Sequence, residues 1–248
     1  MSQSLGVSRS NVYSLARTNR RRALAACALV ALVALVACDD KNSTGPAPLA
    51  STVVLVAPAP QSATVGTALG APIVVVVNDQ NGNPMSGVAL SFTVPSSAGS
   101  LSAAQATTDA NGQASVTWTL GTAAGVDSLT ISAASLPALS VAVTALPDAP
   151  AAITAVTGDQ QSGTVGTSLS SALAVKVTDK YGNPVPNVTV QWSDDAGGTF
   201  ATATTTTDAN GIAHDMYTLG TNPGPEDISA IVVTPQGTMQ TVFTEMGS

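Results

Sequence analysis

The stretch Asp79-Gln80-Asn81-Gly82-Asn83-Pro84 decides the fold, because the chain repeats it as Asp179-Lys180-Tyr181-Gly182-Asn183-Pro184, 100 positions later (179 minus 79). A second stretch, Thr107-Thr108-Asp109-Ala110-Asn111-Gly112, returns as Thr206-Thr207-Asp208-Ala209-Asn210-Gly211 after 99 positions (206 minus 107). One whole unit is therefore duplicated, with one residue lost between the two motifs. A period of about 100 residues is the length of one small β domain, not of a solenoid repeat.

Short alternating apolar runs, rich in Val, Thr and Ala, surround these motifs and are interrupted about every 8–12 residues by Gly, Pro, Asn or Asp. No helical period follows Cys38. The pattern predicts an all-β fold with two tandem β-sandwich domains, at residues 52–147 and 148–248. Prolines at positions 147 and 150 interrupt strand pairing at the boundary.

Aligning the repeats predicts the core, because alternate side chains of a strand point to the same face. The predicted core positions, paired between the copies, are Ile73/Leu173, Val75/Val175, Val77/Val177, Val88/Val188, Leu90/Val190, Phe92/Trp192, Leu101/Phe200, Trp118/Tyr217, Leu120/Leu219, Leu129/Ile228, Leu139/Met239 and Val143/Phe243.

The N-terminal segment predicts export. Arginines precede an uncharged stretch, residues 23–37, which is too short to span a bilayer comfortably and is typical of a signal peptide (residues 1–37). The residues up to Cys38 resemble the lipobox of bacterial lipoproteins, which implies that Cys38 is the lipidated first mature residue. The alternative is an ordinary secretory peptide with Cys38 incidental. Residues 38–51 are expected to form a flexible tether.

Composition restricts the partners. All five arginines precede Cys38, so the mature chain has 3 lysines against 15 carboxylates, a net charge of −12 (3 minus 15). Nucleic acid and anionic headgroups are therefore disfavoured partners. Membrane attachment is expected only through the lipid anchor, and the predicted location is the cell envelope, with the membrane and its facing side left open.

The strand pattern and both turns together resemble bacterial immunoglobulin-like domains of the first group, the kind found in invasin and intimin. The pieces that carry the resemblance are Val-x-Asp, Gly-Asn-Pro and Thr-Asp-Ala-Asn-Gly, in the same order in both copies. The resemblance implies two Ig-like sandwiches in a spacer or interaction module of the cell envelope, which includes cell adhesion.

No pattern in the sequence predicts catalysis, a cofactor or a metal. The Asp79 motif lacks the bidentate glutamate of an EF-hand and is interpreted as a tight turn, with Gly112 and Gly211 left-handed in the second motif. A calcium ion at the domain junction is the alternative that stays open. His214 is expected to face solvent. Asp215 falls at the inward position of Val116 in the first copy, which implies that the strand either frays there or loses its alternation.

Differences between the copies suggest contact sites. Val74 and Val76 take outward positions that Ala174 and Lys176 hold in the second repeat, while Lys180 and Tyr181 replace Gln80 and Asn81 at a turn tip. These four residues, Val74, Val76, Lys180 and Tyr181, are the candidate contacts for another envelope or surface protein. Binding of a glycan or small ligand is the alternative function.

Overall fold

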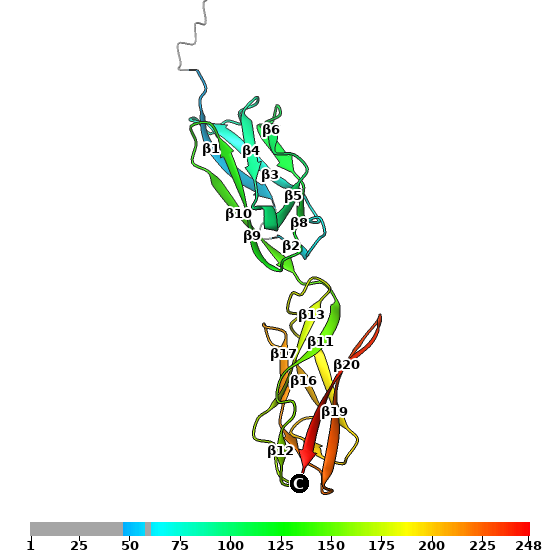
Figure 1. Ribbon diagram of the computed structural model, residues 1–248. Coiled ribbons are helices and arrows are strands. Elements are labelled where there is room, and N and C mark those ends of the chain that lie inside the picture. The colour runs from blue at the N-terminus through cyan, green and yellow to red at the C-terminus, as the bar shows by residue number, and fades with distance from the viewer. Residues whose placement is uncertain (1–46, 58–60) are drawn as a thin grey trace, which may run out of the picture. The chain divides into compact units, whose positions relative to one another are not determined.

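The computed structural model describes residues 47–57 and 61–248, and these form two β-sandwiches (Figure 1). The first contains β1 (Ala50–Ala57), β2 (Gln61–Thr64), β3 (Ile73–Asp79), β4 (Ala89–Thr93), a 3₁₀ turn (Ser96–Ala98), β5 (Gly99–Leu101), β6 (Gln105–Thr107), β7 (Gln113–Val116), β8 (Trp118–Leu120), β9 (Gly125–Ala133) and β10 (Leu139–Leu146). The second contains β11 (Pro150–Thr157), β12 (Ser162–Gly163), β13 (Leu173–Asp179), β14 (Thr189–Asp194), β15 (Thr199–Phe200), β16 (Thr204–Thr206), β17 (Ile212–Asp215), β18 (Tyr217–Thr218), β19 (Gly224–Thr234) and β20 (Gly237–Gly247).

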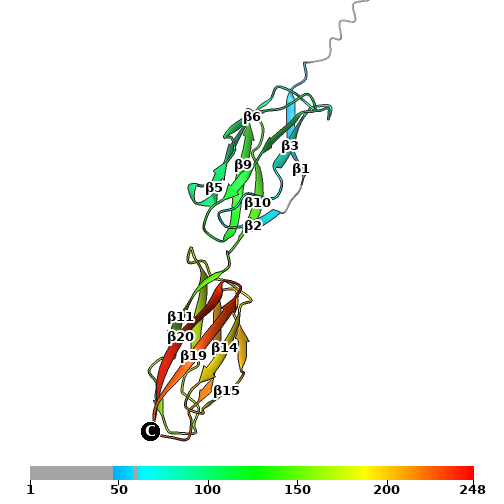
Figure 2. The same cartoon turned by 90° about the vertical axis from the view of Figure 1, so that its right-hand side faces the viewer.

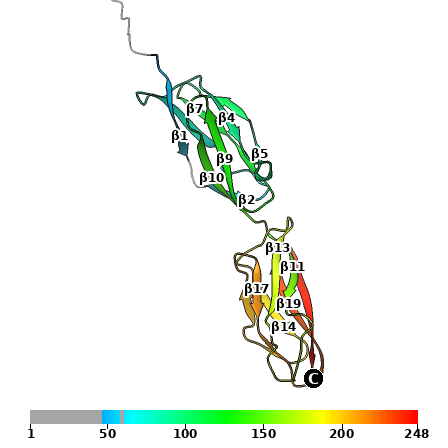
Figure 3. The same cartoon turned by 60° about the vertical axis from the view of Figure 1, so that its left-hand side comes forward.

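The two sandwiches share one topology. The first pairs its strands in the orders β1-β3-β7 and β2-β10-β9-β4-β6, and the second repeats this as β11-β13-β17 and β12-β20-β19-β14-β16. A short two-stranded sheet completes each one, β5-β8 in the first and β15-β18 in the second. Figure 2 shows β20, β19 and β14 side by side, and Figure 3 shows β13 beside β17. The predicted all-β sandwich fold is confirmed.

The core of each sandwich lies between its sheets. The inward residues of β3 alternate strictly with half-buried ones, as a strand with one face on the core requires. Each sandwich has its own apolar cluster, and the predicted positions join it, including Phe92 at 1% and Trp192 at 5% exposure. Six predicted core residues are only partly buried at the margins, namely Val88, Leu101, Leu139, Val188, Phe200 and Met239.

The last strand of each repeat corrects the predicted pairing. Val141 lies opposite Leu129 in the first sandwich, and Phe243 lies opposite Ile228 in the second. Phe243 is therefore the counterpart of Val141, 102 positions earlier (243 minus 141), and not of Val143 as predicted. The β19–β20 hairpin contains the extra residues, which a constant offset could not locate. By the same register, the counterpart of Val143 is Glu245, and that of Leu139 is Thr241 and not Met239 as predicted.

The strand ends differ slightly from expectation. Strand β1 begins at Ala50, inside the stretch predicted to be tether, and β11 begins at Pro150. Proline can occupy the first position of a strand, where its missing N–H costs no ladder bond. No helix in residues 47–57 or 61–248 is both long and apolar enough to cross a membrane.

Candidate functional site

The Asp79 motif folds as a self-contained turn. The Asp79 carboxylate accepts the backbone N–H groups of Asn81 at 2.8 Å and Asn83 at 2.9 Å, and the Asn83 side-chain amide at 3.3 Å. The Asn83 backbone donor lowers the pKa of Asp79 most; burial opposes that shift, and the remaining donors of Asn81 and Asn83 reinforce it. The carboxylate shapes the backbone, as the sequence predicted for a tight turn.

The repeated turn also binds the linker between the sandwiches. Asp179 accepts the same donors from Tyr181 and Asn183, and in addition the backbone N–H of Asp148 at 2.9 Å. Burial alone would raise the pKa of Asp179, but the donors from Asn183, Asp148 and Tyr181 outweigh it and lower the pKa. The second copy of the motif therefore fixes the start of its own domain.

Asn183 then joins the second sandwich to the first. Its side-chain nitrogen donates to the carbonyl oxygen of Thr122 at 2.8 Å, and its side-chain oxygen accepts the N–H of Ala124 at 2.9 Å. Both partners lie in the loop between β8 and β9 of the first sandwich. An amide that satisfies both a donor and an acceptor fixes an orientation as well as a distance.

Tyr181 adds a close contact at the same junction. Its hydroxyl lies 3.2 Å from the position that a Cβ would take at Gly66, a residue with a φ of 74°. The absence of a side chain at Gly66 therefore leaves room for the phenol. Tyr181 is still 43% exposed, so one part of the ring packs on the first sandwich while the rest faces solvent.

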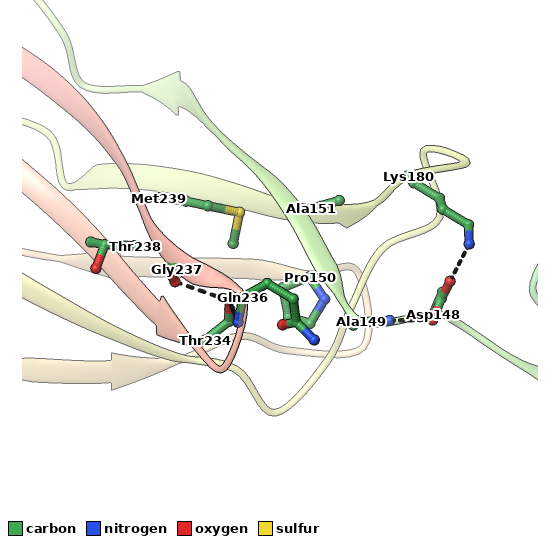
Figure 4. A pocket seen from close by; sticks show the side chains of 10 residues that line it. All are labelled: Asp148, Ala149, Pro150, Ala151, Lys180, Thr234, Gln236, Gly237, Thr238 and Met239. Atoms are coloured by element: carbon green, nitrogen blue, oxygen red, sulfur yellow. Dashed lines mark hydrogen bonds and ion pairs between the residues drawn. The ribbon is translucent and has the colours of Figure 1, made fainter.

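Lys180 is engaged within the second sandwich and its linker. Its ammonium lies 2.8 Å from an Asp148 oxygen and 4.9 Å from the centre of the Tyr181 ring. The Asp148 carboxylate raises the pKa of Lys180, and Lys180 in turn lowers the pKa of Asp148. Figure 4 shows this pair at the edge of a cavity of about 440 Å³, between the start of β11 and the β19–β20 hairpin.

Val74 and Val76 lie on the outer face of the β1-β3-β7 sheet and are half-buried. Val76 is paired with Val54, which is 48% exposed, and Val74 with Ser115. We call Val54, Val74 and Val76 the valine strip. The same face of the second sandwich carries Thr154, Lys176 and His214 beside Ala174 and Ile212, so polar and charged side chains interrupt the apolar surface there.

His214 faces solvent, as predicted, and Asp215 keeps the inward position of Val116. The strand neither frays nor slips. Asp215 is 5% exposed, and its carboxylate accepts the N–H of Thr202 at 2.9 Å and of Met216 at 2.8 Å. These hydrogen bonds compensate for its burial.

The second motif also keeps its predicted geometry. Gly112 and Gly211 are left-handed, with φ of 69° and 71°. Within the described part of the chain, no cluster of three or more His, Cys, Asp or Glu side chains could hold a metal ion. Cys38, the predicted lipidation site, lies outside the described residues.

One threonine in each copy of the second motif has a role that was not predicted from the sequence. Thr108 accepts the N–H of Val88 at 2.9 Å and donates to the carbonyl of Met85 at 2.7 Å. Thr207 makes the same two bonds, to Val188 and Val185. The repeated threonine was a signal that could have found this tie between the two motifs.

The comparison with known protein families and solved structures indicates the same fold as the strand pairing. The family model for the bacterial Ig-like domain (group 1) matches residues 66–146 and 154–244. No curated protein sequence matches the chain significantly. Among solved structures, InvD of Yersinia pseudotuberculosis aligns with 79% of this chain and 57% of its own, at 22% identity and a TM-score of 0.58.

Two further solved structures have lower TM-scores. The adhesin InvE of Yersinia pseudotuberculosis aligns with 79% of this chain at 22% identity and a TM-score of 0.38, and this chain spans 58% of its length. The D0-D1 domains of intimin align with 79% of this chain and 98% of theirs, at 23% identity and a TM-score of 0.32. Because the family model covers most of both sandwiches, this chain belongs to the bacterial Ig-like domain (group 1) family and carries two tandem copies of the domain.

Proposed function

We propose that this chain is a non-enzymatic, lipid-anchored protein of the cell envelope, in which the two Ig-like domains act as a spacer and interaction module. The observation that carries the spacer role is the junction, where Asn183 binds Thr122 and Ala124 and Tyr181 packs at Gly66. A spacer has to resist bending, and directional hydrogen bonds between its domains supply that resistance. Membership of the bacterial Ig-like domain (group 1) family, together with the resemblance of both repeats to the domains of invasin and intimin, supports an interaction role, including adhesion.

The turn tip that was predicted to contact a partner takes part in this junction. Lys180 and Tyr181 contact Asp148, each other and the Gly66 region. The Lys180 ammonium also covers part of the ring that a sugar would need for stacking. These contacts favour the spacer role over the glycan-binding alternative. A glycan array on which binding is lost with Tyr181→Ala would reverse that preference.

The valine strip remains the proposed contact for another envelope or surface protein. It is apolar and uncharged, whereas Lys176 gives the same face of the second sandwich a charge. Val76→Lys introduces the residue type that Lys176 provides on the second sandwich. We expect this substitution to weaken capture of any envelope partner while leaving the fold intact, since both positions are half-buried outward sites.

The anchor is tested by metabolic labelling with a clickable fatty acid. We expect labelling of the wild-type chain and of Cys27→Ala, and no labelling of Cys38→Ala. The Cys27 variant is the matched control because that residue lies within the predicted signal peptide. Labelling of Cys38→Ala at the wild-type level would rule out this cysteine as the attachment site.

The spacer role is tested by energy transfer between a fluorophore after Ser248 and an acceptor dye in the membrane that holds the protein. We expect weak transfer for the wild-type chain and for Asn83→Ala, and stronger transfer for Asn183→Ala, whose junction can bend. Equal transfer from all three proteins would contradict a stiff spacer held by Asn183.

A further inference from the structure

Two glutamates oppose each other inside the second sandwich. Glu226 on β19 and Glu245 on β20 are directly paired across the strands, and each is 1% exposed. Opposed side chains on one face of an antiparallel pair have Cβ atoms about 4.5–5.5 Å apart, and like charges there are destabilising. A buried ionised carboxylate is costly even without such a neighbour. The pair therefore needs a compensating positive charge.

Hydrogen-bond geometry around Glu226 requires an additional proton. The Tyr217 hydroxyl lies 2.7 Å from a Glu226 oxygen and 2.9 Å from an Asp194 oxygen. A phenol has one proton to donate, so both contacts are hydrogen bonds only if one carboxyl group is protonated and donates to the hydroxyl oxygen. Asp194 is partly exposed and already accepts the N–H of Gly198. Glu226 likewise accepts the N–H of Gly220, at 2.9 Å and 3.1 Å, so two carboxyl groups share the single proton of one phenol.

Glu245 provides independent support. Its Oε2 accepts the N–H of Gln161, but its Oε1 is buried without a hydrogen-bond partner among the described residues. Burial raises the pKa of Glu245, and the charge of Asp159 raises it further, against the opposing effect of the Gln161 and Gln160 N–H groups. A proton on this carboxyl group removes its charge, and the charged form is the one that burial disfavours most.

The titratable groups around Glu226 and Glu245 are acids and a phenol, and none of them carries a positive charge. The titratable groups near the pair are Asp194 on β14, Tyr217 on β18 and Asp159 before β12. Within the described part of the chain, the one ion pair is Lys180 with Asp148, in the linker. The carboxylates do not gather into a cluster able to hold a metal ion. A proton is the cation that remains.

The first sandwich lacks this arrangement. Val143 occupies the position of Glu245, and Trp118 that of Tyr217, with its indole N–H donating to the Ala98 carbonyl at 2.8 Å. Only Asp127 corresponds to an acid of the pair, at the position of Glu226. Asp127 also has an oxygen buried without a partner, and burial raises its pKa, but Val143 lies opposite it. The opposed pair of carboxyl groups is thus a property of the second copy.

We propose that the Glu226–Glu245 pair binds a proton at neutral pH, so that mild acid stabilises the second sandwich. A group with a raised folded pKa contributes stability that is fully present below its unfolded value, 4.5 for a glutamate, and is lost as pH rises through the folded pKa. Stability of the second sandwich therefore increases from neutral pH down to about 4.5. Asp179 and Asp208 have lowered pKa values, so the stability that their carboxylates contribute is lost only below pH 3.8, their ordinary pKa.

The direct test is carbon-13 NMR of the side-chain carboxyl groups in the whole mature chain. At pH 7 we expect one glutamate resonance at the position of a neutral acid, absent from Glu226→Gln or Glu245→Gln. The exposed Asp227→Asn, on the opposite face of β19, is the matched control and should leave that resonance in place. Two glutamate resonances that both titrate like exposed carboxylates would overturn the proposal.

The urea midpoint of the second sandwich tests the same proton through stability, with a second variant in case one fails to fold. In a Trp118→Phe background, Trp192 alone reports the second sandwich. We expect its urea midpoint to be higher at pH 5 than at pH 7.5, and this difference to shrink in Glu226→Gln and in Glu245→Val, which restores the residue of the first sandwich. A midpoint that is equal or lower at pH 5, or a difference that both variants keep in full, would contradict a bound proton.

Discussion

The two sandwiches have the same strand order and the same turns, yet they differ in the contacts at their junction and in the side chains of their interiors. In the first, the Asn83 side chain binds the Asp79 carboxylate of its own turn, whereas the Asn183 side chain in the second also binds the loop of the neighbouring sandwich. In the first, Val143 fills the interior, whereas Glu245 is buried at that position in the second. A duplicated motif can thus build the fold in both copies and acquire an additional contact in one of them.

The largest losses of stability should come from replacing the aromatic core residues. These substitutions test whether the two sandwiches fold separately. Phe92→Ala and Trp192→Ala each remove a buried side chain, with an expected cost of about 3–5 kcal/mol. Each should lower the urea midpoint of its own sandwich far more than that of the other. Phe92→Ala is followed by the fluorescence of Trp118, and Trp192→Ala by hydrogen exchange of β13. Equal loss in both sandwiches would show that they unfold as one unit.

The paired threonines test the equivalence of the two copies. Thr108→Val or Thr207→Val leaves a buried N–H and a carbonyl without the hydroxyl that binds both, at a cost of about 1–3 kcal/mol. Urea unfolding of each variant should show similar losses in the respective sandwich. A loss in one copy only would mean that the tie between the motifs differs despite the same geometry.

Acid should separate the turns from the buried glutamates. The carboxylates of Asp79, Asp179 and Asp208 have lowered pKa values. The stability that they contribute is therefore present above pH 3.8, their ordinary pKa, and is lost as the pH falls through the lowered values. Both sandwiches should therefore lose stability in strong acid, measured as a falling urea midpoint between pH 4 and pH 2. An unchanged midpoint in the first sandwich would contradict the role of the Asp79 turn.

The smallest effect should come from Lys180→Gln, which breaks the exposed ion pair with Asp148. Exposed pairs contribute little to stability and are screened by salt. We expect a slight loss of stability of the second sandwich at low salt and none at high salt. Gln80 is the residue of the first repeat at this position, so the substitution also restores the equivalence of the turns. A large, salt-independent loss would show that Lys180 has a further structural contact.

Repetition made the fold predictable from the sequence. Two copies of each motif identified the turns, and alternation identified core residues such as Phe92 and Trp192. A fixed offset failed at Phe243, because the second hairpin holds three extra residues: Val141 follows Leu129 by 12 positions, whereas Phe243 follows Ile228 by 15. The predicted offset of 100 missed the true offset of 102 (243 minus 141) by an even number, so the predicted residues still faced the core. Asn183 and Glu245 escaped prediction because their roles depend on what lies opposite them in space, which periodicity does not specify.

The junction is tested most directly by nitrogen-15 relaxation of both sandwiches in the whole chain. If Asn183 ties the domains together, the wild-type chain and Asn83→Ala should each show one common rotational correlation time for the two sandwiches. Asn183→Ala should give two different and shorter times. Separate correlation times in the wild-type chain, or a common one in Asn183→Ala, would contradict the account.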